Sequence, residues 1–174
     1  VNSYLVANLL YKKISTGEEG PLVVGIDNST IAEHTWLEKG CIRIGFHHYG
    51  DTGTGIFKDV ASVKLKKNQT ISVTFKINGG ITWTKEPKCA LIDNNIKQTW
   101  ESECFELDDA VTVNTKGETT VTLTNTTGAT VTFLPTCLDL SIQYDEYGVV
   151  DVLGEDGNPD WSTVGFEIVS CTIQ

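Results

Sequence analysis

The chain has 174 residues and a mass of 19.0 kDa, a length typical of one domain. Its 13 Lys and Arg against 23 Asp and Glu give a formal net charge of −10. Such an acidic surface repels phosphate groups, which argues against nucleic acid or an anionic membrane as a partner. Hydrophobic residues make up 40% of the chain, and no apolar run is long enough to span a bilayer. We therefore expect a single domain over residues 1–174 with no membrane span.

The first part of the chain carries few local signals. It begins with Val1 and contains no Met, so we expect a processed chain or a part of a longer protein from which any targeting segment has been removed. Residues 4–14 form an apolar segment. Residues 29–37 are the best candidate for a helix, in which Ser29 or Thr30 would cap a short turn with Glu33 nearby.

From residue 63 onward, apolar residues alternate with Thr, Ser and Lys. Alternation places every second side chain on one face, which is typical of half-buried strands in antiparallel sheets. Turn-forming residues separate these strands at 67–69, 78–80, 115–117 and 126–128. The apolar members of the predicted strands are Val63, Leu65, Ile71, Val73, Phe75, Ile77, Val111, Val113, Val121, Leu123, Val131, Phe133, Leu138, Leu140 and Ile142.

The number and spacing of the predicted strands point to one architecture. About ten to twelve short strands with turns between them predict an all-β fold, namely a two-sheet antiparallel β-sandwich of the jelly-roll type with at most one short helix. The opening segment 4–14 and the closing segment 164–173 are both apolar. We expect them to be neighbours, as the termini often are in domains that serve as modules of larger chains.

The cysteines show no metal-binding spacing. None of the five forms a CxxC or CxC pair, so the spacing of a zinc site is not present. We interpret them as small buried apolar side chains, with two disulfides and one free thiol as the alternative. The five are Cys41, Cys89, Cys104, Cys137 and Cys171. Three glycosylation sequons begin at Asn28, Asn68 and Asn125, and they would carry glycans only if the source glycosylates.

Four tryptophans all lie beside polar, turn-like sequence. One or two belong in the core of a sandwich, but several exposed aromatic residues in one place mark a binding surface. A sugar ring has an apolar C–H face that stacks on an aromatic ring, while its hydroxyl groups need polar partners. The predicted ligand-binding residues combine both kinds and are Trp36, His48, Tyr49, Trp83, Gln98, Trp100 and Tyr147.

A second candidate site is the acidic loop 156–160. Asp156, Asn158 and Asp160 place oxygen ligands at alternate positions, as a tight loop around Ca²⁺ does. However, Trp161 lies where an EF-hand requires Gly, and no helix flanks the loop. The loop is therefore either a structural calcium site held by these three residues or an acidic Asn-Pro turn.

The order of several segments resembles a known family. ASVKLKKNQTISVTFKI at 61–77 is followed by CALIDNN, QTW and DDAVTVNTKGETTVTLT within 89–124, and then by ATVTFLPTCLDLSIQ and FEIVSCTI. This series resembles jelly-roll carbohydrate-binding modules attached to polysaccharide-degrading enzymes of gut and rumen bacteria. The resemblance covers residues 61–173, whereas residues 15–57 match nothing. It implies an extracellular, non-catalytic module that binds a plant polysaccharide, with a β-glucan favoured, beside other domains of the parent polypeptide. Trp100 is the one position carried over.

Other functional classes fit the sequence less well. GxSxG, HExxH, P-loop and GxGxxG motifs are absent, so we do not expect an enzyme. In a β-sandwich hydrolase, Glu101 and Glu103 would have to provide the paired carboxylates. The main alternative is a structural or assembly subunit, such as a filament or phage appendage, in which a terminal strand such as 4–10 pairs with a neighbouring copy. A pore-forming toxin is the weakest option, because the acidic surface suits anionic bilayers poorly.

Overall fold

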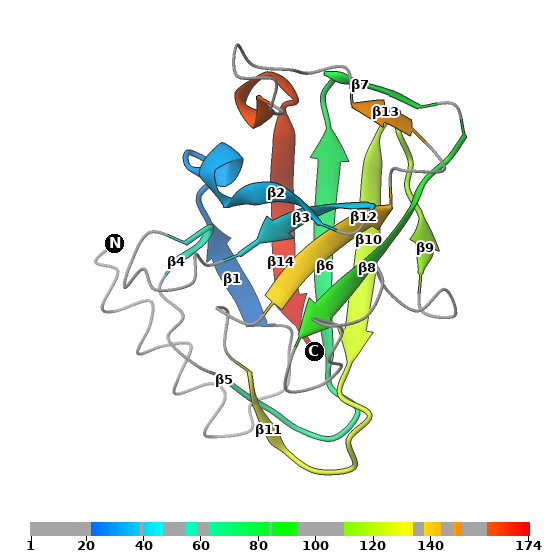
Figure 1. The fold of residues 1–174 in the computed structure, drawn as a ribbon. Coiled ribbons are helices and arrows are strands. Elements are labelled where there is room, and N and C mark those ends of the chain that lie inside the picture. The colour runs from blue at the N-terminus through cyan, green and yellow to red at the C-terminus, as the bar shows by residue number, and fades with distance from the viewer. Residues whose placement is uncertain are drawn as a thin grey trace.

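Two antiparallel five-stranded sheets account for most of the ordered elements (Figure 1). The structure is a computed structural model that describes residues 22–38, 40–46, 55–58, 63–83, 85–93, 110–133, 138–143, 148–150 and 160–174. In spatial order, the first sheet contains β10 (Glu118–Thr124), β6 (Thr70–Ile77), β14 (Phe166–Ile173), β1 (Leu22–Ile26) and β4 (Phe57–Lys58). The second contains β2 (Thr35–Glu38), β3 (Cys41–Gly45), β12 (Leu138–Gln143), β8 (Lys88–Asp93) and β9 (Val111–Thr112). Two further ribbons pair β11 (Val131–Phe133) with β5 (Val63–Leu65) and β13 (Gly148–Val150) with β7 (Ile81–Trp83).

The strand pairings follow the pattern of one long hairpin that has been rolled up. Strand β1 pairs with β14, β3 with β12, β6 with β10, and β8 with β9, so that pairs nest from the ends of the described chain toward its middle. Rolling this hairpin brings β14 beside β6 and β12 beside β8, and closes the two sheets. This is the topology of a jelly roll. The predicted all-β, two-sheet fold is therefore confirmed.

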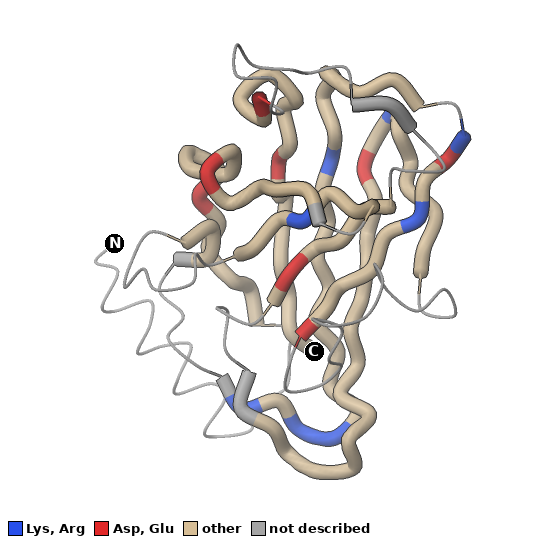
Figure 2. Tube along the Cα trace, in the orientation of Figure 1, with Lys and Arg blue, Asp and Glu red and all other residues tan. Residues whose placement is uncertain are grey.

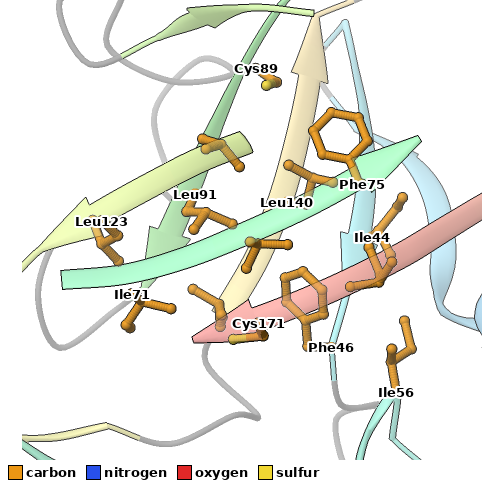
Figure 3. Packing of buried hydrophobic residues seen from close by; sticks show 14 of the residues in the cluster. Ile44, Phe46, Ile56, Ile71, Phe75, Cys89, Leu91, Leu123, Leu140 and Cys171 are labelled. Carbon is orange, nitrogen blue, oxygen red and sulfur yellow. The ribbon is translucent and has the colours of Figure 1, made fainter. Parts of the chain in front are cut away.

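The core lies between the two sheets. Strand β6 shows how it forms, because its eight residues alternate strictly between half-exposed and buried positions. Figure 3 shows Ile71 and Phe75 of this strand together with Leu91 of β8 and Leu140 of β12 in the space between the layers. Removing such a side chain from water contributes about 1.5–3 kcal/mol. The alternation in the sequence thus identifies the face of each strand that stabilises the sandwich.

Helical structure is smaller than the predicted segment 29–37. A single 3-10 turn, η1, spans Ile31–His34, and the chain then enters β2 at Thr35. Thr30 is the N-cap residue but makes no side-chain capping bond, whereas the Thr35 hydroxyl donates to the Ile31 carbonyl at 2.7 Å. The helix prediction was therefore wrong for 35–37, because Trp36 and its neighbours pair with β3 instead. A second 3-10 turn, η4, spans Trp161–Thr163 and was not predicted.

The cysteines agree with the prediction of buried apolar side chains at two positions. Cys89 and Cys171 are free thiols buried in the core, and burial raises the pKa of each from 9.0 to about 12. Cys41 is disulfide-bonded. Because two of the five cysteines are free, the alternative of two disulfides and one free thiol is wrong. The sequence positions Cys104 and Cys137 lie outside the described residues.

Candidate functional site

The outer face of the second sheet carries polar residues that are buried. In β3, Arg43 lies between the core residues Ile42 and Ile44, and in β12, Asp139 lies between two core leucines. Neighbouring residues of a strand point to opposite faces, so both charged side chains point away from the core. Arg43 is nonetheless 0% exposed and Asp139 only 4%. Figure 2 shows the basic and acidic segments on these adjacent strands in the middle of the sheet.

The two charged groups form an ion pair. The Arg43 Nη1 and Asp139 Oδ2 atoms lie 3.9 Å apart, and their side chains are 1% and 5% exposed. Ser141 is paired with Arg43 in the strand register and is also fully buried. Because desolvating a charge is costly, replacing only one of the two residues would remove this compensation from the other buried charge and destabilise the fold. The pair lies across β3 and β12, which are already joined by five paired positions.

Trp36 lies directly beside this ion pair. It is paired with Arg43 across β2 and β3, so both side chains are on the outer face. A Cβ atom added to Gly45 would lie 3.1 Å from each of two indole carbons of Trp36 and 3.3 Å from Oδ1 of Asp139. The indole thus lies over Gly45, which provides the space because it has no side chain. Trp36 remains partly exposed. It combines a fixed aromatic surface with polar neighbours on a rigid sheet.

Two of the sequence segments predicted to bind ligand follow strands that end at one edge of this face. Gly45, the last residue of β3, is paired with Asp139, and Asp93, the last residue of β8, is paired with Leu138. Strands β3 and β8 therefore end at the same end of the sheet, beside the start of β12. His48 and Tyr49 follow β3 in the sequence, and Gln98 and Trp100 follow β8, but all four lie outside the described residues.

The structure places Trp83 elsewhere. Trp83 is in β7, where it is paired with Gly148 of β13 and is half-buried against the core. The β7–β13 ribbon lies at the top of Figure 1, toward the end of the sheet where β8 begins. The structure therefore does not bring Trp83 together with Trp36. Tyr147 precedes Gly148 and lies outside the described residues, as does the Glu101 and Glu103 pair.

Trp161, which is not a predicted ligand-binding residue, also packs against the core. Its ring lies 6.1 Å from that of Phe166. Two of the three described tryptophans, Trp83 and Trp161, thus pack against the core while remaining partly exposed, and none of the three is itself a core residue.

Only part of the predicted calcium loop is described. Asp160 is the N-cap of the η4 turn, and its Oδ1 accepts hydrogen bonds from the backbone N–H and the hydroxyl of Ser162. Asp156 and Asn158 lie outside the described residues. Within the described part of the chain, no three His, Cys, Asp or Glu side chains are grouped as metal ligands would be. Calcium binding by this loop stays a prediction.

The three sequon asparagines differ in what their side chains do. Asn28 bonds twice to residue 168: its Nδ2 donates to the carbonyl at 2.9 Å and its Oδ1 accepts from the N–H at 2.8 Å. Asn125 is fully buried, and its Nδ2 donates to the carbonyls of Leu65 and Ala129. Asn68 is exposed in a turn with φ of 67°. Two of the three amides therefore hold the fold together.

Sequence reasoning missed Arg43, Asp139 and Ser141. The signal was present, because Arg43 interrupts the apolar strand CIRIG at 41–45, and Asp139 and Ser141 alternate with apolar residues in LDLSIQ at 138–143. Alternation assigns such residues to the outer face but does not reveal that they are buried.

Comparison of the chain with protein-family models, curated proteins and solved structures gave no match. The resemblance to carbohydrate-binding modules therefore rests on the sequence segments alone. Among the described residues, no helix has the length and hydrophobicity required to cross a bilayer.

Proposed function

We propose that this chain is a non-catalytic, extracellular module that binds a plant cell-wall polysaccharide, with a β-glucan as the favoured class, within a larger secreted protein. The observation that carries the proposal is the partly exposed indole of Trp36, which lies over Gly45 at the end of β3. A sugar ring buries its apolar face on such an indole while its hydroxyl groups bond to polar neighbours.

The position of this indole supports the proposal further. Trp36 is held on a sheet that also includes β3 and β8, after which the segments with His48, Tyr49, Gln98 and Trp100 follow in the sequence. These are the aromatic and hydrogen-bonding residue types that sugar binding requires. The proposed ligand-binding surface is therefore the end of the second sheet where β3 and β8 stop, around the partly exposed indole of Trp36.

Affinity gel electrophoresis tests the proposal. Gels containing soluble cellulose derivatives, xyloglucan, mannan, xylan or starch should retard the wild-type chain with at least one β-glucan. Trp36→Ala should weaken binding by about tenfold to a hundredfold, because a stacked aromatic contact contributes about 1–3 kcal/mol. The matched control is Trp161→Ala, which removes a half-buried indole that packs against Phe166. Thermal melts of both variants establish that they are folded.

A second variant keeps the indole but moves it. Gly45→Ala adds a methyl group 3.1 Å from the Trp36 ring, so the ring must shift and binding should weaken several-fold while the protein stays folded. Because the proposed module is non-catalytic, incubating the wild-type chain with the same polysaccharides should release no reducing sugar. Unretarded migration on every gel, or equal losses from Trp36→Ala and Trp161→Ala, would contradict the proposal.

A further inference from the structure

The edges of the two sheets differ sharply in length. Three edge strands are short: β4 and β9 have two residues each and β2 has four. The fourth edge strand, β10, has seven residues. Short edge strands prevent other chains from adding to a sheet, because they offer few free backbone groups. Of the described edges, only β10 is long enough to accept another strand.

Strand β10 itself also lacks three features that commonly protect an edge, namely a bulge, a proline and a lysine. All seven of its residues are paired with β6 in one unbroken register, so no bulge twists it away. The strand contains no Pro and no Lys, and its one charged residue is Glu118 at its start. Natural edge strands are commonly protected by such charges, prolines or bulges. Within the described part of the chain, the other side of β10 pairs with no strand.

We propose that β10 pairs antiparallel with β10 of a second copy of this chain. A two-fold axis through Val121 would join the two first sheets into one continuous sheet of ten strands. The buried residues of one β10 strand must be paired with the buried residues of the other, so that both strands turn the same face to the core. Because side chains alternate between the two faces, only residues whose numbers differ by an even value can be paired. The register centred on Val121 meets this condition and uses the whole strand. It places Thr120 opposite Thr122 and Glu118 opposite Thr124.

The side chains of β10 suit this pairing. Threonine pairs already join the exposed faces of β6 and β10, where the hydroxyl oxygens of Thr74 and Thr120 are 2.8 Å apart and those of Thr70 and Thr124 are 2.9 Å apart. The Thr120–Thr122 pairs across the two-fold axis would repeat this arrangement. Cross-strand Thr pairs stabilise antiparallel sheets. A two-fold axis presents the same residues from both copies, so each favourable pair occurs twice.

The charges at the ends of β10 are complementary in this register. Glu118 begins the strand and Thr124 ends it. The end at Thr124 adjoins the turn that contains Lys66 and Lys67, because the Asn68 N–H donates to the Asn125 carbonyl at 2.9 Å. Figure 2 shows basic segments on this turn and none at the adjoining end of β10. Each copy would therefore place its Glu118 carboxylate at the lysine-bearing end of the other. This complementarity selects a second copy as the partner, independently of any sugar binding.

Sedimentation velocity over a range of protein concentrations tests the pairing. The wild-type chain should associate reversibly into dimers. Thr120→Lys/Thr122→Lys places ammonium groups directly opposite each other twice across the axis, and should raise the dimer dissociation constant by at least about tenfold. The matched control is Ser170→Lys/Thr172→Lys, which adds the same charge to the same face on β14, away from the edge.

Two additional variants keep the test decisive if the double variant fails to fold. Glu118→Lys alters one exposed residue and should weaken the dimer several-fold, because it brings like charges together at the lysine turn. In addition, a mixture of Thr120→Cys and Thr122→Cys chains should form a disulfide-linked dimer under mild oxidation, more readily than either variant alone. A chain that remains monomeric at millimolar concentration, or a dimer unaffected by the β10 substitutions, would overturn the proposal.

Discussion

Arg43 and Asp139 are charged residues that are buried on the outer face of the second sheet. Each interrupts an apolar strand, points away from the core, and is buried against the other. Their alternation with core residues was readable in the sequence, whereas their burial was not, because alternation reveals the direction of a side chain and not what surrounds it. The same limit applies to Trp36, whose position over Gly45 depends on the pairing of β2 with β3.

The two buried thiols lead to a prediction about alkaline pH. Burial raises the pKa of Cys89 and Cys171 from 9.0 to about 12, so between these pH values the thiols ionise in the unfolded chain but not in the folded one. Unfolding then releases protons, so a rising pH favours the unfolded chain. The contribution of the two protonated thiols to stability is complete below pH 9 and is lost as the pH rises toward 12. Each thiol should reduce the free energy of unfolding by about 1.4 kcal/mol per pH unit above pH 9.

Urea unfolding at pH 8 and at pH 10 measures this effect. Both Cys89→Ala and Cys171→Ala should lower the stability at either pH, because each removes a buried sulfur. Between pH 8 and pH 10, however, each variant should lose about 1.4 kcal/mol less stability than the wild type, because it has one fewer thiol to ionise. The comparison of slopes separates thiol ionisation from the titration of Lys and Tyr, which the variants share with the wild type. Equal pH slopes in the variants and the wild type would contradict the prediction.

At the scale of strands, the sequence predicted the elements whose two faces differ in polarity. Strands β6 and β10 each have one buried and one polar face, so their alternation was clear. Strand β3 is buried at all five positions and β8 at five of its six. A strand buried on both faces shows no alternation to detect, which is why the 41–45 segment was not predicted. The η1 turn is too short to carry a helical period.

The turn between β6 and β7 yields a prediction about how elements pack. Gly80 has φ of +81°, and a Cβ at this position would lie 2.7 Å from the Cα of Val164, which follows η4. Gly128 has nearly the same φ, +83°, but nothing lies within 4 Å of a Cβ there. Gly80→Ala should therefore cost clearly more stability than Gly128→Ala, because both pay the same backbone strain but only the first forces two backbone segments apart.

Thermal or urea unfolding of the two glycine variants checks this expectation. Gly128→Ala should lower the free energy of unfolding by about 1 kcal/mol, and Gly80→Ala by about 2–4 kcal/mol. Equal losses would show that the turn can shift away from η4 without a cost in stability. The close approach of Gly80 to Val164 would then not contribute to the packing at this end of the sandwich.

At the scale of the whole molecule, the fold depends on contacts between distant parts of the chain. Leu22 at the start of the described chain is paired with Ile173 near its end. The sequence predicted the kind of strands, but its number of about ten to twelve falls short of the fourteen in the described residues. It also could not assign β14 to the position between β6 and β1, because period-two patterns do not identify partners. The candidate site had the same limit: Trp36 and Trp83 looked equivalent in the sequence, and only the topology separates them.

The central position of β14 leads to a prediction for the unfolding of the whole chain. Because β14 is paired on both sides, Thr172→Pro removes a ladder hydrogen bond donor inside the sheet and should cost at least about 3 kcal/mol. Thr172→Ala keeps the backbone N–H and should cost less than about 1 kcal/mol. Since both sheets contribute to one core, the loss should affect them together. Far-UV circular dichroism and tryptophan fluorescence should then follow one coincident urea transition, shifted to lower urea in the proline variant. Two separate transitions would instead mean that the two sheets unfold independently and that residues 1–174 do not form a single domain.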